Sequence, residues 1–335
     1  MRIRGWVALA TAMTVLGGLA GSASAAGKYK VGYDIYWAGN SWSVQIEKEF
    51  EAEAAKHTDK IDKVFYVESE LKADKQVSNI EDLITKGVDV IITTPISPTT
   101  LIPVLKKAQA KGIKVVLLAS TIKSQDYDLL VTVDDVDFGK VGAEWLVKKL
   151  NGKGKLVALN GVPGISVSDD RWKGAKAVFD ANPGIQVVAS ADASWDYAQA
   201  KVAMSNLLAA NPEIDGIWSQ GGAMTLGAID AFQAAQRPLV PMTGEDNNGY
   251  LKRWAELRAK GFDSIATSKP TWLGSEALIL ALDLLDGKQV KKDNVLPVPT
   301  ITAENLDKFV RADLPDSFWN NTRLSDDQVK AAFAK

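Results

Sequence analysis

The strongest constraint on the fold is an alternation of short apolar stretches with longer stretches of helical spacing, repeated about ten times. The expected strands lie at 31–36, 62–67, 88–93, 113–118 and 129–133, and then at 154–160, 185–191, 214–219, 239–243 and 263–267. The expected helices lie at 41–56, 74–86, 98–111 and 137–150, and then at 169–181, 195–210, 222–235, 247–260 and 271–286. Parallel strands need such crossovers, whose handedness places helices on both faces of a sheet. The alternation therefore predicts an α/β fold with two doubly wound parallel sheets.

The chain offers no long linker between the two sets of units, because no stretch rich in Pro, Gly or Ser separates them. We therefore expect a hinge of short crossing segments, near Val131–Asp135 and Thr267–Pro270. The predicted N-terminal domain comprises 28–132 plus 269–290, and the C-terminal domain 133–268 plus 291–302. The last stretch, 303–335, ends in an amphipathic turn at 326–334 and is expected to pack on one or both domains as a tail.

The first residues are typical of a secretory signal peptide. Arg2 and Arg4 precede an apolar stretch at 6–20, and Ala23-Ser24-Ala25 has the small residues of a cleavage site. The apolar stretch is short for a membrane-spanning helix, which needs about 18 residues or more. We expect cleavage near Ala25 and export to the periplasm.

Charge and composition exclude several classes of function. Loss of Arg2 and Arg4 takes the formal net charge from −2 to −4, which disfavours nucleic acid and anionic membranes as partners. The chain has no cysteine, so we expect no disulfide and no thiol chemistry. Its one histidine, His57, ends an acidic helix, where a solvated position is more plausible than catalysis. Adjacent acidic residues such as Asp169–Asp170 are more often helix caps than acid/base couples. We expect no enzymatic activity, no metal site and no cofactor.

The loops that follow the expected strands carry planar polar groups and tryptophan. They include Asn40-Ser41-Trp42, Ser120-Thr121, Ser194-Trp195, Gln220-Gly221-Gly222, Glu245-Asp246-Asn247-Asn248 and Ser268-Lys269, and Arg171 lies one turn into a helix. An aromatic face can stack on a sugar ring, while amides, carboxylates and guanidinium groups bind hydroxyls. Each residue also has a plainer interpretation, such as a packing lid or a turn former. The set favours a ligand site because it falls on one edge of each sheet.

The chain resembles a known family, the type I periplasmic sugar-binding proteins of ABC importers. The resemblance covers 28–302 and rests on Asn40-Ser41-Trp42, Ile80–Ile84, Gly87–Ile92, Asp170–Gly174, Trp195-Asp196, Gln220–Ala228 and Gly244-Glu245-Asp246. It implies two α/β domains of the type I periplasmic binding protein fold that close on a ligand.

The resemblance also implies roles for individual residues. Asn40 would bind a hydroxyl, Trp42 and Trp195 would flank the ring, and Arg171 and Asp246 would hold its hydroxyls. Ser268 occupies the position of a polar hinge residue. The chain departs from the family pattern at two positions, where Ser120 and Gly221 replace charged or amide contacts.

These features predict a monomeric periplasmic binding component of an ABC transporter. It would capture one monosaccharide or polyol by hinge closure and deliver it to the permease in the inner membrane. Two alternatives remain open: a sugar sensor that docks on a chemoreceptor, and an exported carbohydrate-active enzyme.

Overall fold

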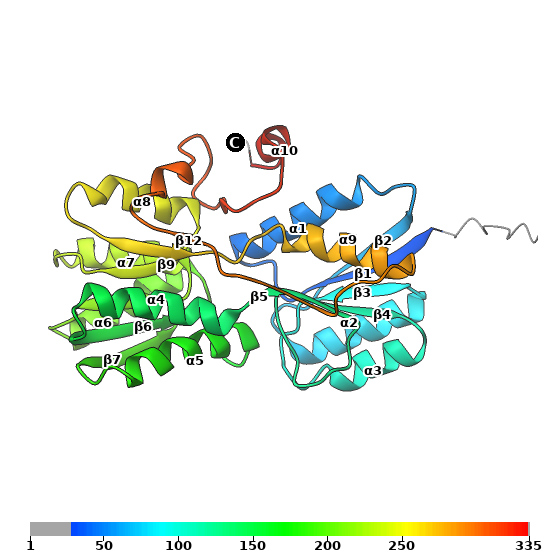
Figure 1. Ribbon diagram of the computed structural model, residues 1–335, viewed down its shortest axis with the longest axis horizontal. Coiled ribbons are helices and arrows are strands. Elements are labelled where there is room, and N and C mark those ends of the chain that lie inside the picture. The colour runs from blue at the N-terminus through cyan, green and yellow to red at the C-terminus, as the bar shows by residue number, and fades with distance from the viewer. Residues whose placement is uncertain (1–27, 334–335) are drawn as a thin grey trace, which may run out of the picture.

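A computed structural model of the chain describes residues 28–333 (Figure 1). The expected signal peptide at 1–25, with its cleavage near Ala25, lies outside the described residues. Within 28–333, no helix combines the length and the apolar character that a bilayer-spanning segment needs.

Two six-stranded sheets form the framework, and together with their helices they are called the first lobe and the second lobe. The first sheet has the order β11-β5-β4-β3-β1-β2 and the second β12-β10-β9-β8-β6-β7. The strands of the first are β1 (Tyr29–Ile35), β2 (Ile61–Glu68), β3 (Val90–Thr93), β4 (Lys114–Leu118), β5 (Leu129–Val133) and β11 (Asp293–Leu296). Those of the second are β6 (Gly154–Asn160), β7 (Ile185–Asp192), β8 (Gly216–Ser219), β9 (Met242–Glu245), β10 (Ser264–Thr267) and β12 (Thr300–Ile301). All neighbours pair in parallel except β10 and β12, which are antiparallel.

Helices cover both faces of each sheet, as the alternation predicts. The first lobe contains α1 (Ser41–Ala54), α2 (Ala73–Lys86), α3 (Ile102–Ala110) and α9 (Leu273–Leu285). The second contains α4 (Asp135–Lys149), α5 (Ser166–Asp180), α6 (Tyr197–Ala210), α7 (Gly222–Ala234) and α8 (Asn248–Arg258). Each face has its own apolar cluster: in β3, Val90 and Ile92 join α1 and α9, whereas Ile91 joins α2 and α3. The predicted α/β fold with two doubly wound sheets is confirmed.

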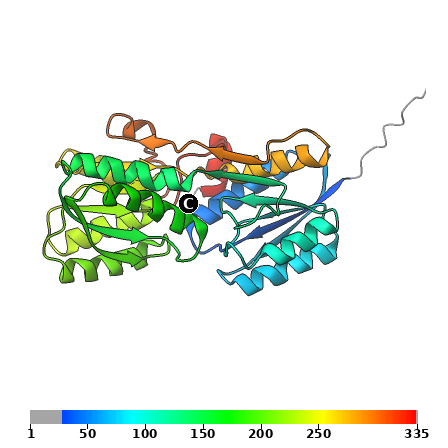
Figure 2. The ribbon, with the colours of Figure 1, turned by 60° about the horizontal axis from the view of Figure 1, so that its bottom comes forward.

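Three short segments connect the lobes, which lie side by side in Figures 1 and 2. The first joins β5 to α4 and the second joins β10 to α9, where the sequence predicts crossings. The third, at 297–299, joins β11 to β12, whereas the predicted domain bounds place this crossing near 290. The expected assignment of 291–302 to the C-terminal domain is wrong for Asp293–Leu296, because this strand pairs with β5 of the first sheet. The other domain boundaries remain a prediction.

One strand begins later than the sequence pattern suggests. The expected strand at 239–243 is observed as β9, Met242–Glu245. Pro238 and Pro241 explain the shift, since proline has no N–H to donate within a central ladder. As a result, β9 ends at Glu245, and this residue lies at the carboxyl edge of the sheet.

The tail after β12 contains the 3₁₀ turn η1 (Leu306–Lys308) and the helix α10 (Asp326–Phe333). Leu314, Phe318 and Val329 form a small apolar cluster of its own. In Figure 1 the tail crosses above the lobes and ends with α10 near α1.

Helices α4 and α5 approach each other closely because glycines face the contact. A Cβ on Gly139 would lie 1.8 Å from the carbonyl oxygen of Arg171, and one on Gly174 would lie 1.9 Å from that of Val136. Both carbonyl oxygens are backbone atoms, so a change of side-chain rotamer cannot relieve the steric clash. The pair of glycines therefore fixes where Arg171 lies relative to α4.

We expect Gly139→Ala to lower the free energy of unfolding by about 1–3 kcal/mol, the usual cost of overpacking. Gly142→Ala is the matched control in the same helix, because its Cβ would lie 3.4 Å from Thr243 Cγ2, an ordinary contact. This control should be neutral or stabilising by up to about 1 kcal/mol through helix propensity. Urea unfolding measures both, and equal stability of the two variants would contradict this account of the α4–α5 contact.

Candidate ligand-binding site

A cavity of ≈ 50 Å³ lies between the lobes, at the carboxyl ends of strands from both sheets. Its lining comprises Tyr36, Asn40, Trp42, Thr94 and Ala119 from the first lobe, Ile165, Val167, Arg171, Trp195 and Glu245 from the second, Lys269 from the second connection and Trp319 from the tail. Ligands of open α/β sheets bind at this edge, in sites that are mostly apolar with a few convergent polar groups. The cavity combines apolar and aromatic side chains with a few polar and charged groups in the same way.

The first wall of the cavity is built on the start of α1. Asn40 caps this helix, since its Oδ1 accepts from the N–H of Ser43 at 2.8 Å, and its Nδ2 donates to the Tyr36 hydroxyl at 3.0 Å. A primary amide has a second N–H to offer. Trp42 donates its Nε1 proton to the carbonyl of Lys269 at 2.8 Å, which fixes the plane of its ring.

Trp195 forms the opposite wall in an unusual backbone conformation. Ser194 and Trp195 both have positive φ, 51° and 56°. Consecutive left-handed residues cost free energy and persist where the surroundings enforce them, which is frequent at ligand sites. Gly161 makes room for the indole, because a Cβ there would lie 2.1 Å from Trp195 Cε2. The buried Nε1 of Trp195 has no hydrogen-bond partner among residues 28–333.

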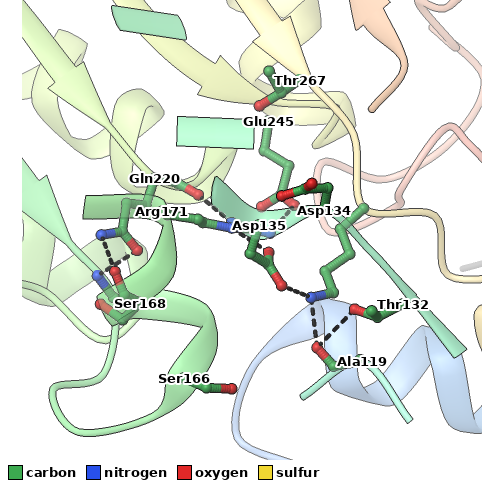
Figure 3. Close-up of polar contacts among 12 residues, drawn as sticks. Ala119, Thr132, Asp134, Asp135, Ser166, Ser168, Arg171, Gln220, Glu245 and Thr267 are labelled. Atoms are coloured by element: carbon green, nitrogen blue, oxygen red, sulfur yellow. Dashed lines mark hydrogen bonds and ion pairs between the residues drawn. The ribbon is translucent and has the colours of Figure 1, made fainter. Parts of the chain in front are cut away.

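Four charged side chains form one network at the base of the cavity (Figure 3). Arg171 donates to Asp135 Oδ1 at 3.0 Å, to Glu245 Oε1 at 3.2 Å and to the Gln220 carbonyl at 2.7 Å. Its guanidinium carbon lies 3.5 Å from the centroid of the Phe138 ring. Lys269 donates to Asp135 Oδ2 at 2.6 Å and to the Ala119 carbonyl at 2.5 Å. Two cations thus face two carboxylates, which compensates the cost of burying them.

The pKa shifts follow from burial and from this pairing. Burial raises the pKa of Glu245, and the nearby Arg171 partly opposes the rise. Burial lowers the pKa of Lys269, and the nearby Asp135 partly opposes the fall. Burial favours neutral Arg171, but Glu245 and Asp135 outweigh it and raise the pKa. Arg171 therefore keeps its charge and its fixed fork of donors.

Four of the eight predicted site residues, Asn40, Trp42, Arg171 and Trp195, line the cavity together. The other four, Ser120, Gly221, Asp246 and Ser268, are close neighbours of the lining but do not belong to it. Ser120 donates to the Pro95 carbonyl at 2.9 Å and lies 3.1 Å from Ser166 Oγ of the second lobe. Gly221 leaves space for Trp195, since a Cβ there would lie 3.0 Å from its Cδ1.

Asp246 and Ser268 face the tail. Asp246 Oδ2 accepts from the N–H of Asn321 at 2.8 Å, and Ser268 Oγ accepts from Asn321 Nδ2 at 3.1 Å. Arg171 pairs with Glu245 and not with the neighbouring Asp246. Successive side chains in an extended segment point to opposite sides, so only one of the two acidic residues at the end of β9 can face Arg171.

Sequence reasoning missed part of the lining: Tyr36, Thr94, Ala119, Ile165, Val167, Glu245, Lys269 and Trp319. Glu245 and Lys269 lie in loops that it did single out, each beside the residue it chose. Trp319 had no such signal, because it lies far along the chain from the repeated units.

Comparison with known proteins identifies relatives that match most of the chain. A family model described as periplasmic binding protein domain matches residues 31–289. The ribose import binding protein RbsB of Bacillus subtilis is 28% identical over 271 residues, which cover 81% of this chain and 86% of that protein. The xylitol-binding protein of Mycolicibacterium smegmatis is 33% identical over 233 residues, 69% of this chain and 66% of that one.

Solved structures agree with these matches. An ABC transporter solute binding protein from Mycobacterium smegmatis with bound glycerol superposes with a TM-score of 0.78 and 25% identity, covering 88% of this chain and 99% of that chain.

The buried Asp246 generates a prediction about pH. Burial, and then the nearby Glu245, raise its pKa from 3.8 to about 7. Between these values the folded chain holds a proton that the unfolded chain has released, so stability falls as the pH rises through this window. Asp246→Asn keeps an acceptor for the Asn321 N–H but carries no charge. We expect this variant to lose less free energy of unfolding than the wild type between about pH 5 and pH 8.

Urea unfolding at a series of pH values measures the difference. Asp180→Asn is the control, because Asp180 is an exposed partner of Lys176, and this variant should follow the wild-type profile. Parallel profiles for the wild type and Asp246→Asn would show that Asp246 is not the buried titrating group.

Proposed function

Because the chain belongs to the periplasmic binding protein domain family, a family of solute-binding proteins and not of enzymes, we propose that it captures a monosaccharide or polyol in the cavity between its lobes. The captured ligand is handed to the permease of an ABC importer in the inner membrane. The chain works in the periplasm as a monomer after cleavage near Ala25. A role as a sugar sensor for a chemoreceptor uses the same binding step and remains the alternative.

The observation that carries this proposal is the composition of the cavity wall. Trp42 and Trp195 bring flat apolar surfaces from opposite lobes, and Asn40 adds an amide. The network of Arg171, Lys269, Asp135 and Glu245 offers both donors and acceptors while its charges balance. A neutral ligand with many hydroxyls and an apolar ring face matches such a wall. The ligands in the names of its relatives, ribose, xylitol and glycerol, are neutral and rich in hydroxyls, and ribose also has a ring.

Contacts between the lobes support a closing motion. The N–H of Thr121, in the first lobe, donates to Ser166 Oγ of the second at 3.0 Å, and Ser120 lies beside the same hydroxyl. Trp195 packs against the apolar clusters of both lobes. A ligand reaches the cavity when these contacts open, and it stabilises the closed state by binding both walls at once.

In a thermal-shift screen with D-ribose, xylitol, glycerol, myo-inositol and D-galactose, we expect at least one ligand to raise the melting temperature of the wild type. A ligand at about 100 times its Kd adds about 2.7 kcal/mol to the free energy of unfolding. Trp195→Ala should weaken binding of the best ligand by about 1–2 kcal/mol, about five- to thirtyfold, through lost apolar contact.

Trp145→Ala is the control for this variant, since Trp145 packs in the second lobe on α4 and does not line the cavity. Calorimetric titration should give it wild-type affinity. Absence of stabilisation by sugars and polyols as a class would refute the proposed function.

We also expect the radius of gyration from small-angle scattering to decrease when the best ligand saturates the protein. The lobes are joined by three short connections, so rotation about these connections changes the overall dimensions. A radius that stays constant on saturation would exclude a large closing motion.

A further inference from the structure

The tail continues beyond the part of the chain that the family model matches, and part of it contacts both lobes. This part, residues 311–323, is called the strap. On the second lobe, the buried Asn248 at the start of α8 holds it: Asn248 Nδ2 donates to the carbonyls of Arg311 and Leu314 at 2.8 and 3.2 Å, and Asn248 Oδ1 accepts from the Arg311 N–H at 3.0 Å. The backbone N–H of Asn248 also donates to the Phe318 carbonyl at 2.8 Å.

On the first lobe, Gln45 of α1 binds the backbone of Trp319 twice. Its Oε1 accepts from the Trp319 N–H at 2.8 Å, and its Nε2 donates to the Trp319 carbonyl at 2.9 Å. Gln45 is 0% exposed, so both bonds are shielded from water. Trp319 Nε1 also donates to Ser41 Oγ at 3.0 Å. Three hydrogen bonds to α1 thus determine the position of a single tryptophan.

Beyond Trp319 the strap contacts the second connection through Asn321. Asn321 binds Asp246 and Ser268 as described above, and its Oδ1 accepts from Trp272 Nε1 at 3.0 Å. Asn321 thus binds Oδ2 of Asp246, a carboxylate that the sequence had suggested for the ligand.

Trp319 is 4% exposed and lines the cavity together with Trp42 and Trp195. We propose that Trp319 is a ligand-contacting residue that limits the size of the sugar or polyol that the site accepts. The inference rests on the proposed function and deepens it. An indole is the largest side chain available, and its position here is fixed by Gln45 and Ser41, so it cannot move aside for a larger ligand without breaking buried hydrogen bonds.

The test compares ligands of different size. Calorimetry gives Kd values for glycerol, xylitol and myo-inositol with the wild type, Trp319→Ala and Trp319→Phe. We expect Trp319→Ala to lower the ratio of the myo-inositol Kd to the xylitol Kd at least about fivefold, with Trp319→Phe between it and the wild type. A merely structural role would weaken all ligands by one common factor, and an unchanged ratio would overturn the proposal.

Trp272→Phe is the matched control. It removes the bond to Asn321 and loosens the strap, but Trp272 does not line the cavity, so the ratio should stay at the wild-type value. A shift of the ratio in this control equal to that of Trp319→Ala would assign the effect to the strap as a whole and overturn the role of Trp319.

A second measurement does not depend on the folding of Trp319→Ala. In wild-type protein labelled with 5-fluorotryptophan, the fluorine resonance of Trp319, assigned with Trp319→Phe, should move on saturation with the tightest of the three probes. A stationary resonance would overturn the proposal while leaving the proposed function intact. A wild type that binds no sugar or polyol would instead overturn the proposed function, and the inference with it.

Discussion

The shared carboxylate of Asp135 is the interaction on which the two-lobed arrangement depends. It accepts from Arg171 and from Lys269, which are 2% and 3% exposed. A buried cation without a partner costs several kcal/mol, so Lys269 depends on Asp135, while Arg171 shares Asp135 and also pairs with Glu245. Asp135 directly follows the first connection between the lobes, and Lys269 lies in the second. The network that presents donors and acceptors to the cavity therefore also ties the two connections together.

The alternation of strands and helices could be predicted because each element is recognisable from its own residues. The position of the third connection could not, since β11 and β12 are short and their pairing depends on distant strands. The lining of the cavity was likewise predictable only in part. Loops at the carboxyl ends of strands indicated Asn40, Trp42 and Trp195, and the start of a helix indicated Arg171. The choice between Glu245 and Asp246 depends on which neighbour faces Arg171. The local sequence pattern does not say which of two adjacent side chains faces a residue from another element.

The close contact of α4 with α5 shows how packing and chemistry are joined in the second lobe. Gly139 and Gly174 let the two helices approach until backbone meets backbone. The first turn of α4 contributes Asp135, and the first two turns of α5 contribute Arg171. Because both helices are fixed by this contact, the ion pair between them needs little further ordering. The ion pair at the base of the cavity thus rests on two helices that are packed together.

The strap has a consequence for the order in which the molecule assembles. The bond between Gln45 and Trp319 joins residues 274 positions apart, and contacts of such separation carry a large entropic cost until the intervening chain is folded. Its attachment points on α1 and α8 exist only once each lobe has formed. We therefore expect the strap to dock after both lobes have formed, so that the wall formed by Trp319 is completed last.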